Sequence, residues 1–492
     1  MKVLLLNPPY FPMFSRASRS PAVTKSSTLY YPFFLAYATG VLEDEGFDVT
    51  LIDAPAVGLN RQATIEKIKR SRPDLVVCET STPSIDNDME VVKELKKAGV
   101  PFVVAVGTHV SALPGEVLKE NPFLNAVARR EYEYTILELT QKLSDAGMDA
   151  DLDLINGLSH RQDGIIRHNP DRAAIENLDA LPFVSRVYRD HLRRHINSYF
   201  YGDTMHPVVS ILTGRGCPHQ CAYCVYPQTM TGHQYRLRSV TNVVNELEFI
   251  SKQLPEVREV FIEDDTLTVN RKRAQAIAQE IIDRKLRITW TTNSRADVDY
   301  ETMKIMHQSG CRLLCVGFES CSQEILNKLG KNIKRESYFK FRDDAARAGL
   351  LIHGCFMYGN EGETHETMRD TLELAKKLNC DAAQFYPITV YPGTRAYNTY
   401  KDKGYLTAKS YRDWLTHDGL HNCVVSLPNI SKEELVRFCD QSRCEYYLRP
   451  GYLISKVAQV VFHPREFKRN FRGARTLIKH LFRFSLGKFS NN

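Results

Sequence analysis

Three cysteines in one short stretch have the spacing that most clearly supports chemistry. Cys217, Cys221 and Cys224 lie in a loop that also contains two glycines and a proline. Several thiolates converging on one point are what a soft metal centre needs. A closed zinc site or an electron-transfer cluster takes four protein ligands, so three cysteines predict a 4Fe–4S cluster with one iron open to substrate or cofactor. Zinc binding and disulfides remain alternative explanations of this spacing.

The elements around the cysteines place them at one end of a parallel sheet. Residues 208–212 are an apolar run that predicts a strand, and a helical pattern begins near Ser239. Further strands are predicted at residues 259–263, 287–291, 313–317, 351–358 and 382–387. This repeated strand–helix rhythm over residues 201–400 predicts a partial (βα)6 barrel, with catalytic groups at the carboxyl ends of its strands.

The C-x3-C-x2-C spacing, with Tyr223 just before the last cysteine, resembles the radical S-adenosylmethionine (SAM) superfamily. The resemblance implies that the three cysteines are the metal ligands and catalytic residues of a 4Fe–4S cluster whose open iron is chelated by SAM. It also implies that an external one-electron donor, of the flavodoxin or ferredoxin type, drives cleavage of SAM. The 5′-deoxyadenosyl radical then abstracts a hydrogen from an unactivated carbon.

Polar and small residues follow the predicted barrel strands, where a SAM pocket would lie. The candidates for cofactor binding are Tyr223, Asp264, Asp265, Arg295, Gly317, Glu319 and Ser320. A guanidinium fork at Arg295 matches the SAM carboxylate, and the segment 317–320 resembles the family position that meets the SAM ribose or amino acid. The glycines are equally compatible with helix-entry turns, and the carboxylates with general bases or metal ligands.

Residues 1–145 alternate strand and helix signals, which predicts a doubly wound, Rossmann-like α/β domain. Three of its turns resemble the cobalamin-binding domain found before many radical SAM domains. The cofactor-binding candidates in these turns are Asn7, Thr80, Ser81, Gly107, Thr108 and His109. The D-x-H-x-x-G signature of a cobalt-ligating histidine is absent, so His109 is expected to line the pocket only. A domain that keeps this fold without cobalamin is the alternative.

Two further regions complete the predicted organisation. Residues 146–200 are expected to be a linker that contains a hairpin turning at Asp163–Gly164. Residues 401–492 lose the strand–helix rhythm and predict a helical region, with a helix over 433–460. The tail interleaves apolar residues such as Phe467 and Phe482 with arginines. This pattern predicts a basic amphipathic helix, either lying on an anionic membrane or docking on the barrel.

Composition narrows the class of protein. The chain has 492 residues, of which 43% are hydrophobic and 25% charged, as in ordinary globular proteins. No signal peptide or membrane span is expected. Outside the triplet no two cysteines have convincing metal spacing, and Cys311/Cys315 and Cys439/Cys444 are interpreted as packed thiols, which fits a reducing cytoplasm. The tail from 465 to 488 has eight Lys/Arg and one Glu, so its charge equals the whole-chain net charge of +7. Basic residues therefore do not gather near the predicted chemistry, and no nucleic-acid module is expected.

These observations lead to two hypotheses about the reaction and to two alternative classes of function. The leading hypothesis is cobalamin-dependent methylation of a small-molecule or lipid substrate. The alternative is radical rearrangement, cyclisation or elimination without cobalamin, because residues 20–26 and 29–35 resemble enzymes that act on hopanoid lipids and sugar-type products. An iron–sulfur electron carrier would need no SAM pocket, and an RNA-modifying radical SAM enzyme would need an added RNA-binding module.

Overall fold

The first sheet is a mainly parallel sheet of seven strands in the order β2–β1–β3–β4–β5–β6–β7. The computed structural model describes residues 1–462 and residue 471. The strands are β1 (Lys2–Asn7), β2 (Asp48–Asp53), β3 (Leu75–Thr80), β4 (Phe102–Gly107), β5 (Ala126–Ala128), β6 (Leu158–Gln162) and β7 (Ile165–His168). The last two strands are antiparallel and form the predicted hairpin, which extends this sheet at its edge.

Helices cover both faces of the first sheet, which explains why its central strands are apolar along their whole length. The helices of this region are α1 (Phe33–Asp44), α2 (Ala54–Val57), α3 (Arg61–Ser71), α4 (Ile85–Lys97), α5 (Thr108–Ala112), α6 (Pro114–Glu120) and α7 (Glu133–Ala146). Helices α1 and α7 share one buried cluster with the sheet, and α3, α4 and α6 share the cluster on the opposite face.

The second sheet has six parallel strands in the order β15–β14–β13–β12–β11–β8. They are β8 (Val208–Ile211), β11 (Glu259–Ile262), β12 (Trp290–Ser294), β13 (Cys311–Glu319), β14 (Leu351–Tyr358) and β15 (Ala382–Pro387). Because neighbours in the sheet are also successive in the chain, the connecting helices lie on one side. This is the arrangement of an incomplete (βα)6 barrel. The pair β9 (Gly214–Arg215) and β10 (Arg236–Leu237) forms a small separate ribbon.

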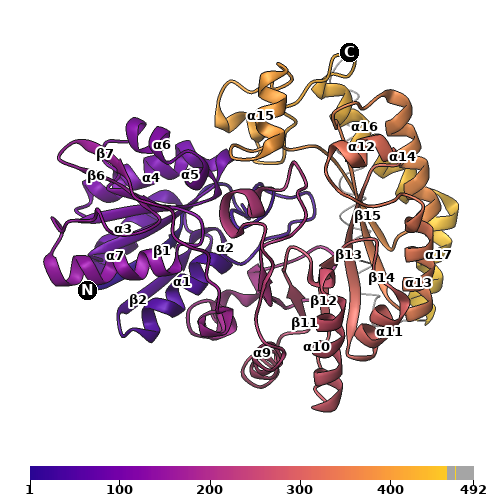
Figure 1. Ribbon diagram of the computed structural model, residues 1–492, viewed down its shortest axis with the longest axis horizontal. Coiled ribbons are helices and arrows are strands. Elements are labelled where there is room, and N and C mark those ends of the chain that lie inside the picture. The colour runs from indigo at the N-terminus through magenta and orange to yellow at the C-terminus, as the bar shows by residue number, and fades with distance from the viewer. Residues whose placement is uncertain (463–470, 472–492) are drawn as a thin grey trace.

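The helices of the second half follow the strands in turn. They are α8 (Val184–Val187), α9 (Val240–Gln253), α10 (Arg271–Asp283), α11 (Tyr300–Gln308), α12 (Gln323–Lys328), α13 (Ser337–Ala348), α14 (His365–Leu378), α15 (Arg395–Asp402), α16 (Lys432–Tyr447) and α17 (Pro450–Phe462). Figure 1 shows the two sheets side by side, with α10, α11, α13 and α14 on the outer side of the second sheet.

Two sequence predictions about element bounds are wrong in detail. The strand expected at 287–291 begins at Trp290, because its neighbour β11 pairs only from Val260 opposite Trp290 onward. The single helix expected over 433–460 is two helices, since Pro450 has no N–H to continue α16 and instead begins α17.

Helix α1 and the residues just before it contact both halves of the molecule. The Tyr31 hydroxyl donates to the carbonyl of Val208 (3.1 Å), and the Tyr37 hydroxyl lies 3.4 Å from the carbonyl of Leu212. One hydrophobic cluster therefore runs from α1 and α7 through β8 into the second sheet. The two sheets are joined by a shared core and not by a solvated linker alone.

No helix among the described residues is long and apolar enough to cross a membrane. The predicted basic amphipathic helix falls almost wholly outside the described residues. Its membrane contact, and the expected cytoplasmic location, stay predictions.

Candidate active site

The cysteine loop leaves the carboxyl end of β8 and is held by its own backbone. Gly216 has a φ of +86°, and a Cβ there would lie 2.2 Å from the carbonyl oxygen of Gln234. The position therefore requires glycine. The Gln228 amide donates to the carbonyls of Cys221, Ala222 and Cys224 at 3.3, 3.2 and 2.8 Å, which closes the loop around one side chain.

The three thiols of this loop fit a cluster better than a single ion. Each cysteine is half-buried, and their charges influence one another. In the part of the chain that the structure describes, the sulfur atoms of these three cysteines do not all lie within 4.8 Å of one another. A tetrahedral zinc ion, with Zn–S bonds of about 2.3 Å, would hold sulfurs about 3.8 Å apart. Burial raises the pKa of Cys217 to about 11 and also raises the pKa of Cys221 and Cys224. Several nearby cationic irons would stabilise these three thiolates.

Asp264 anchors the start of the loop. Its carboxylate accepts hydrogen bonds from the Thr213 amide (2.6 Å), the Thr213 hydroxyl (2.6 Å), the Gly214 amide (3.1 Å) and the Tyr235 hydroxyl (2.9 Å). The side chain is fully buried, and burial raises its pKa. Both of its oxygens accept hydrogen bonds from the chain, so Asp264 positions the start of the loop, and its expected contact with SAM stays a prediction.

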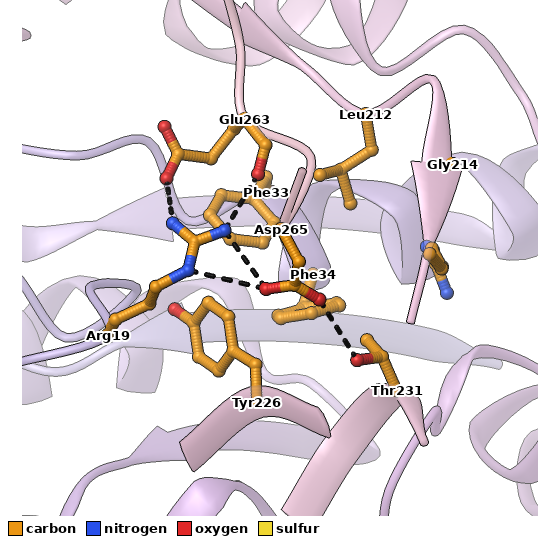
Figure 2. Close-up of a pocket in the computed structure, with 10 residues that line it drawn as sticks. Arg19, Phe33, Phe34, Leu212, Gly214, Tyr226, Thr231, Glu263 and Asp265 are labelled. Atoms are coloured by element: carbon orange, nitrogen blue, oxygen red, sulfur yellow. Dashed lines mark hydrogen bonds and ion pairs between the residues drawn. The ribbon is translucent and has the colours of Figure 1, made fainter. Parts of the chain in front are cut away.

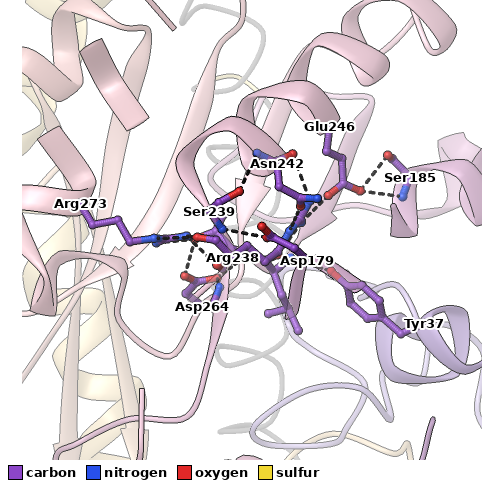
Figure 3. Close-up of polar contacts among 12 residues, drawn as sticks. Tyr37, Asp179, Ser185, Arg238, Ser239, Asn242, Glu246, Asp264 and Arg273 are labelled. Atoms are coloured by element: carbon purple, nitrogen blue, oxygen red, sulfur yellow. Dashed lines mark hydrogen bonds and ion pairs between the residues drawn. The ribbon is translucent and has the colours of Figure 1, made fainter. Parts of the chain in front are cut away.

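Figure 3 shows the buried polar network behind this anchor. Arg273 donates to the carbonyls of Thr213 (2.6 Å) and Arg238 (3.0 Å), and Arg238 donates to the carbonyl of Leu212 (2.8 Å). Arg238 is paired with Glu246, which in turn accepts from the Ser185 hydroxyl at 2.8 Å. Hydrogen bonds from these two arginines therefore fix the carbonyls of Leu212 and Thr213, just after β8.

Glu319 connects the cysteine loop to two other strands. Its Oε1 accepts from the Tyr223 hydroxyl (2.9 Å) and the Lys331 ammonium (2.7 Å), and its Oε2 accepts from the Tyr386 hydroxyl (3.1 Å). Glu319 has a φ of +64°, an uncommon conformation for a residue with a side chain. A Cβ at Gly317 would lie 2.2 Å from Glu319 Oε1. Gly317 therefore leaves room for this ion pair.

Arg19 reaches from the segment after β1 to the mouth of the second sheet (Figure 2). Its guanidinium pairs with Glu263 and lies 3.1 Å from Asp265 Oδ1, and Asp265 also accepts from Thr231 (3.5 Å). The charges of Arg19 and Asp265 both act on Cys224. This places a cation and a carboxylate beside the cysteine loop, between the two sheets.

The remaining barrel candidates have partners within the chain. Arg295 donates to the carbonyl of Lys331 (2.7 Å) and pairs with Asp297, while its charge acts on Cys217 and Cys221. Ser320 is fully buried, and its hydroxyl accepts from the amide of Ser322 (3.1 Å). Arg295 thus lies near the cluster site, whereas Ser320 shapes the turn after β13.

The six candidates of the first sheet gather at the carboxyl ends of β1, β3 and β4. Thr80 is paired with Gly107, where φ is +114° and a Cβ would lie 2.3 Å from the Thr80 carbonyl oxygen. Thr108 follows as the first residue of α5 and is half-buried. Ser81 is buried and hydrogen-bonded to Ser84 at 2.8 Å, and Asn7 donates to Asp53 at 2.8 Å.

His109 is held as a neutral ring at the same edge. Its Nδ1 lies 3.2 Å from the Thr82 hydroxyl, and its ring packs edge-on against Tyr411 at 4.5 Å. Burial lowers the pKa of His109 to about 3. A neutral, buried histidine agrees with the expected role in lining a pocket.

This edge fits an organic cofactor rich in hydrogen-bonding groups. Within the described part of the chain, the buried polar atoms without a hydrogen-bond partner include Glu79 Oε2 and His109 Nε2 at this edge. Buried polar atoms are normally satisfied, so a group that supplies the missing partners belongs beside them. The corrin of cobalamin carries amide side chains that both donate and accept.

Tyr226 shows that the two edges face one another. Burial raises the pKa of its hydroxyl, and the charges of Glu263 and of Glu79, which come from different sheets, raise it further. Phe33 and Phe34 of α1 pack edge-on against the Tyr226 ring at 6.2 and 5.7 Å. The candidate cluster site and the candidate cobalamin edge therefore border one interior region.

Sequence reasoning did not identify four of the residues that build this region. Arg19, Glu79, Lys331 and Tyr386 were not among its candidates. Glu79 begins the turn 79–83 that supplied the candidates Thr80 and Ser81, whereas the other three lie in no recognisable motif. Arg19 directly precedes the opening segment 20–26 that was noted for its resemblance.

Two family models match the chain. The model described as the radical SAM superfamily matches residues 211–375, and the model described as a B12 binding domain matches residues 19–140. The first spans the cysteine loop and the second spans the polar edge of the first sheet.

Relatives extend over nearly the whole chain. The uncharacterized methyltransferase PH0819 of Pyrococcus horikoshii is 31% identical over 475 residues, which cover 96% of this chain and 98% of that protein. The anaerobic magnesium-protoporphyrin IX monomethyl ester cyclase of Rubrivivax gelatinosus is 28% identical over 76% of this chain and 66% of its own.

Solved structures share the fold. The radical SAM methyltransferase TsrM from Kitasatospora setae, solved with cobalamin and a [4Fe-4S] cluster, has a TM-score of 0.67 at 20% identity, covering 83% of this chain and 76% of that chain. The cobalamin-dependent radical enzyme OxsB has a TM-score of 0.64 at 16% identity, covering 89% of this chain and 61% of its own.

The fold and the two matched models define a class of enzyme, in which a B12-binding domain precedes a radical SAM barrel. The chain belongs to this family, as its identity with PH0819 over almost the full length shows. The predicted fold class, and the predicted cofactors at the level of the family, are confirmed. Membership in an enzyme family also excludes the electron-carrier alternative, whereas a hopanoid or other lipid substrate finds no support in these comparisons.

Proposed function

We propose that the protein methylates an unactivated carbon of a small molecule in a cobalamin-dependent radical SAM reaction. The observation that carries the proposal is the position of Tyr226, whose ring packs against Phe33 and Phe34 of α1 and lies 5.3 Å from the guanidinium carbon of Arg19, which pairs with Glu263. This arrangement supports two cofactors acting on one substrate. When bound, the cluster supplies the electron that cleaves SAM, and cobalamin supplies the transferable methyl group.

The residues around the cluster site would bind and orient. Cys217, Cys221 and Cys224 would hold three irons. Glu319, fixed by Tyr223, Lys331 and Tyr386, would keep the loop in register with β13 and β15. Arg295 would attract the SAM carboxylate, since its charge already acts at the cysteine loop.

The residues between the sheets would exclude water and hold protons. Phe33, Phe34 and Tyr226 present an apolar wall to the interior. Burial raises the pKa of Glu79 to about 8, so near neutral pH its carboxyl keeps a proton and can donate a hydrogen bond to a corrin amide. Gly107 lets the ligand approach the backbone where a side chain would collide with Thr80.

The test uses anaerobically purified enzyme from cells supplied with cobalamin, with the cluster reconstituted and an external one-electron donor added. With methyl-deuterated SAM and candidate substrates, we expect 5′-deoxyadenosine, S-adenosylhomocysteine and a deuterated methyl group in the product. Replacing all three cysteines by alanine should abolish product formation. Stoichiometric iron with no corrin absorbance would contradict the proposal.

Ring formation is a second candidate, because one relative that spans most of the chain is named as a cyclase. Cyclisation moves no methyl group into the product. The same deuterated SAM therefore distinguishes the two reactions, since a product without the label but with 5′-deoxyadenosine release would favour cyclisation.

A further inference from the structure

A second group of metal-ligating side chains lies on β13 and β14, away from the cysteine loop. One ligand atom each from Cys315, His353 and Cys355 lies within 4.8 Å of the other two. The parallel register pairs Cys315 with His353 and Gly317 with Cys355. Alternate residues of a strand share a face, so all three side chains project from the same side of the sheet.

That side is the interior face of the incomplete barrel. The intervening residues Leu314, Val316 and Phe318 are buried on the other side, in the core that the outer helices cover. Cys315 and Cys355 instead act electrostatically on Tyr30, which Glu263 also influences. The group therefore faces the same interior as the mouth residues described above.

The histidine of the group is oriented by a carboxylate. His353 Nδ1 is paired with Asp203, and the imidazole side chain is 16% exposed. A histidine that donates Nδ1–H to a carboxylate presents the lone pair of Nε2 on the opposite side of the ring. This carboxylate–histidine pairing is the usual outer-shell support of a metal-ligating imidazole.

The charges around the two thiols favour a cation. The two thiols are hydrogen-bonded to one another, which lowers the pKa of Cys315 and raises the pKa of Cys355. The other charges acting on them come from Asp203, Glu263 and Glu319, all acidic, and from His353. A divalent ion would neutralise both thiolates in this acidic setting.

We propose that Cys315, His353 and Cys355 bind one Zn²⁺ ion, with its fourth position open to the barrel interior. Two thiolates and one imidazole are a soft donor set that suits zinc, and three protein ligands with an open position are typical of zinc that binds a substrate or water. The open position would take a thiolate, carboxylate or imidazole of the substrate. That last role, unlike metal binding, rests on the proposed function.

The test measures zinc where the cluster cannot interfere. In protein with Cys217, Cys221 and Cys224 all replaced by alanine, we expect about one zinc per chain after growth with Zn²⁺ and dialysis against a weak chelator. Adding Cys315→Ser or Cys355→Ser should reduce zinc to under about a tenth per chain. The matched control is Cys321→Ser, whose half-buried thiol lies near Arg335 and outside the group; it should retain zinc.

A second measurement keeps the result independent of how well these variants fold. The protein with Cys217, Cys221 and Cys224 replaced by alanine, loaded with Co²⁺ after metal removal, should show thiolate-to-cobalt charge-transfer bands that Zn²⁺ displaces. His353→Gln should weaken Zn²⁺ affinity by about 10-fold or more. Sub-stoichiometric zinc in the triple-alanine protein, or zinc unaffected by Cys315→Ser and Cys355→Ser, would overturn the proposal. A disulfide or free dithiol with no metal would do the same. Since none of these readouts uses SAM cleavage, the proposed reaction can fail while the zinc site stands.

Discussion

Glu319 is the residue on which most of the contacts at the cluster site depend. It takes three hydrogen bonds from residues on three different segments, while its own backbone has a φ of +64°. Such a conformation costs free energy and persists only where the surroundings determine it. This conformational free energy is spent at a residue beside the cysteine loop, whose hydrogen bonds orient Tyr223 and Lys331.

We predict that Glu319→Gln slows SAM cleavage by about 10- to 100-fold, as is typical when an outer-shell partner of a metal site is lost. The amide cannot balance the charge of buried Lys331. The measurement is 5′-deoxyadenosine release by the reconstituted enzyme, with iron content determined in parallel. The control is Glu324→Gln on α12, where the side chain is 75% exposed and pairs only with Lys328. Equal rates of 5′-deoxyadenosine release in the two variants would show that Glu319 does not support SAM cleavage.

Glu79 makes a separate prediction about pH. Burial raises its pKa from 4.5 to about 8 in the folded protein. Between these values the unfolded state loses the proton and the folded state keeps it, so this residue lowers the free energy of unfolding as pH rises. Glu79→Gln removes the effect.

In cobalamin-free protein, the stability of Glu79→Gln relative to the native sequence should therefore increase from pH 5 to pH 8. Urea unfolding of both proteins at pH 5 and pH 8 measures this difference in the free energy of unfolding. A stability difference that does not change with pH would show that Glu79 ionises normally in the folded state.

The cysteine loop is the element that holds the three candidate cluster ligands. Its path is set by a glycine that no side chain can replace, by the amide of Gln228 and by the carboxylate of Asp264. These contacts fix the backbone of the loop, and none of them uses a thiol, so the thiols stay available to bind iron. The loop is thus preorganised by hydrogen bonds that do not involve the sulfurs.

We predict that Gly216→Ala destabilises the fold by about 2 kcal/mol or more and prevents stoichiometric iron binding, because the methyl group meets the Gln234 carbonyl. Gly58→Ala is the matched control: φ is also positive, at +73°, but nothing lies within 4 Å. It should cost about 1–2 kcal/mol and leave iron content unchanged. Full iron loading of Gly216→Ala would refute the argument.

At the scale of the whole molecule, the segment between β1 and α1 joins the two halves. Arg19 binds Glu263 and Asp265 across the interface, Ser20 meets Tyr391 at 3.1 Å, and His421 contacts the Ser20 carbonyl at 2.9 Å. Residues from both halves and from the last region meet here. Their mutual orientation sets the space between the candidate cofactor sites.

Removing the Arg19 charge should loosen this junction. Arg19→Met leaves two buried carboxylates without their cation, and since the Arg19 side chain is 30% exposed we expect a loss of about 1–3 kcal/mol. Denaturant unfolding and limited proteolysis between the sheets measure it. Arg61→Met is the control, because its pair with Glu94 is about 40% exposed at both ends and should contribute under about 1 kcal/mol. Equal losses in both variants would assign Arg19 no role in the junction.

The sequence by itself determined what depends on short stretches of chain. The ligand count of the cysteine loop, the hairpin at Asp163–Gly164 and most strand positions follow from local spacing and hydrophobic period. The family resemblance followed from the same local motifs. These features need no knowledge of which distant segments meet.

Only the tertiary structure decided which side chains face one another. Tyr223 and Glu319 are 96 residues apart, Arg19 and Glu263 are 244 apart, and Cys315 meets His353 only because β13 and β14 are neighbours in the sheet. Asp264 likewise meets Thr213, Gly214 and Tyr235 only in the folded chain, because these partners lie 29 to 51 residues before it. The reason is physical: strand order and register bring remote residues together, and a linear sequence records neither.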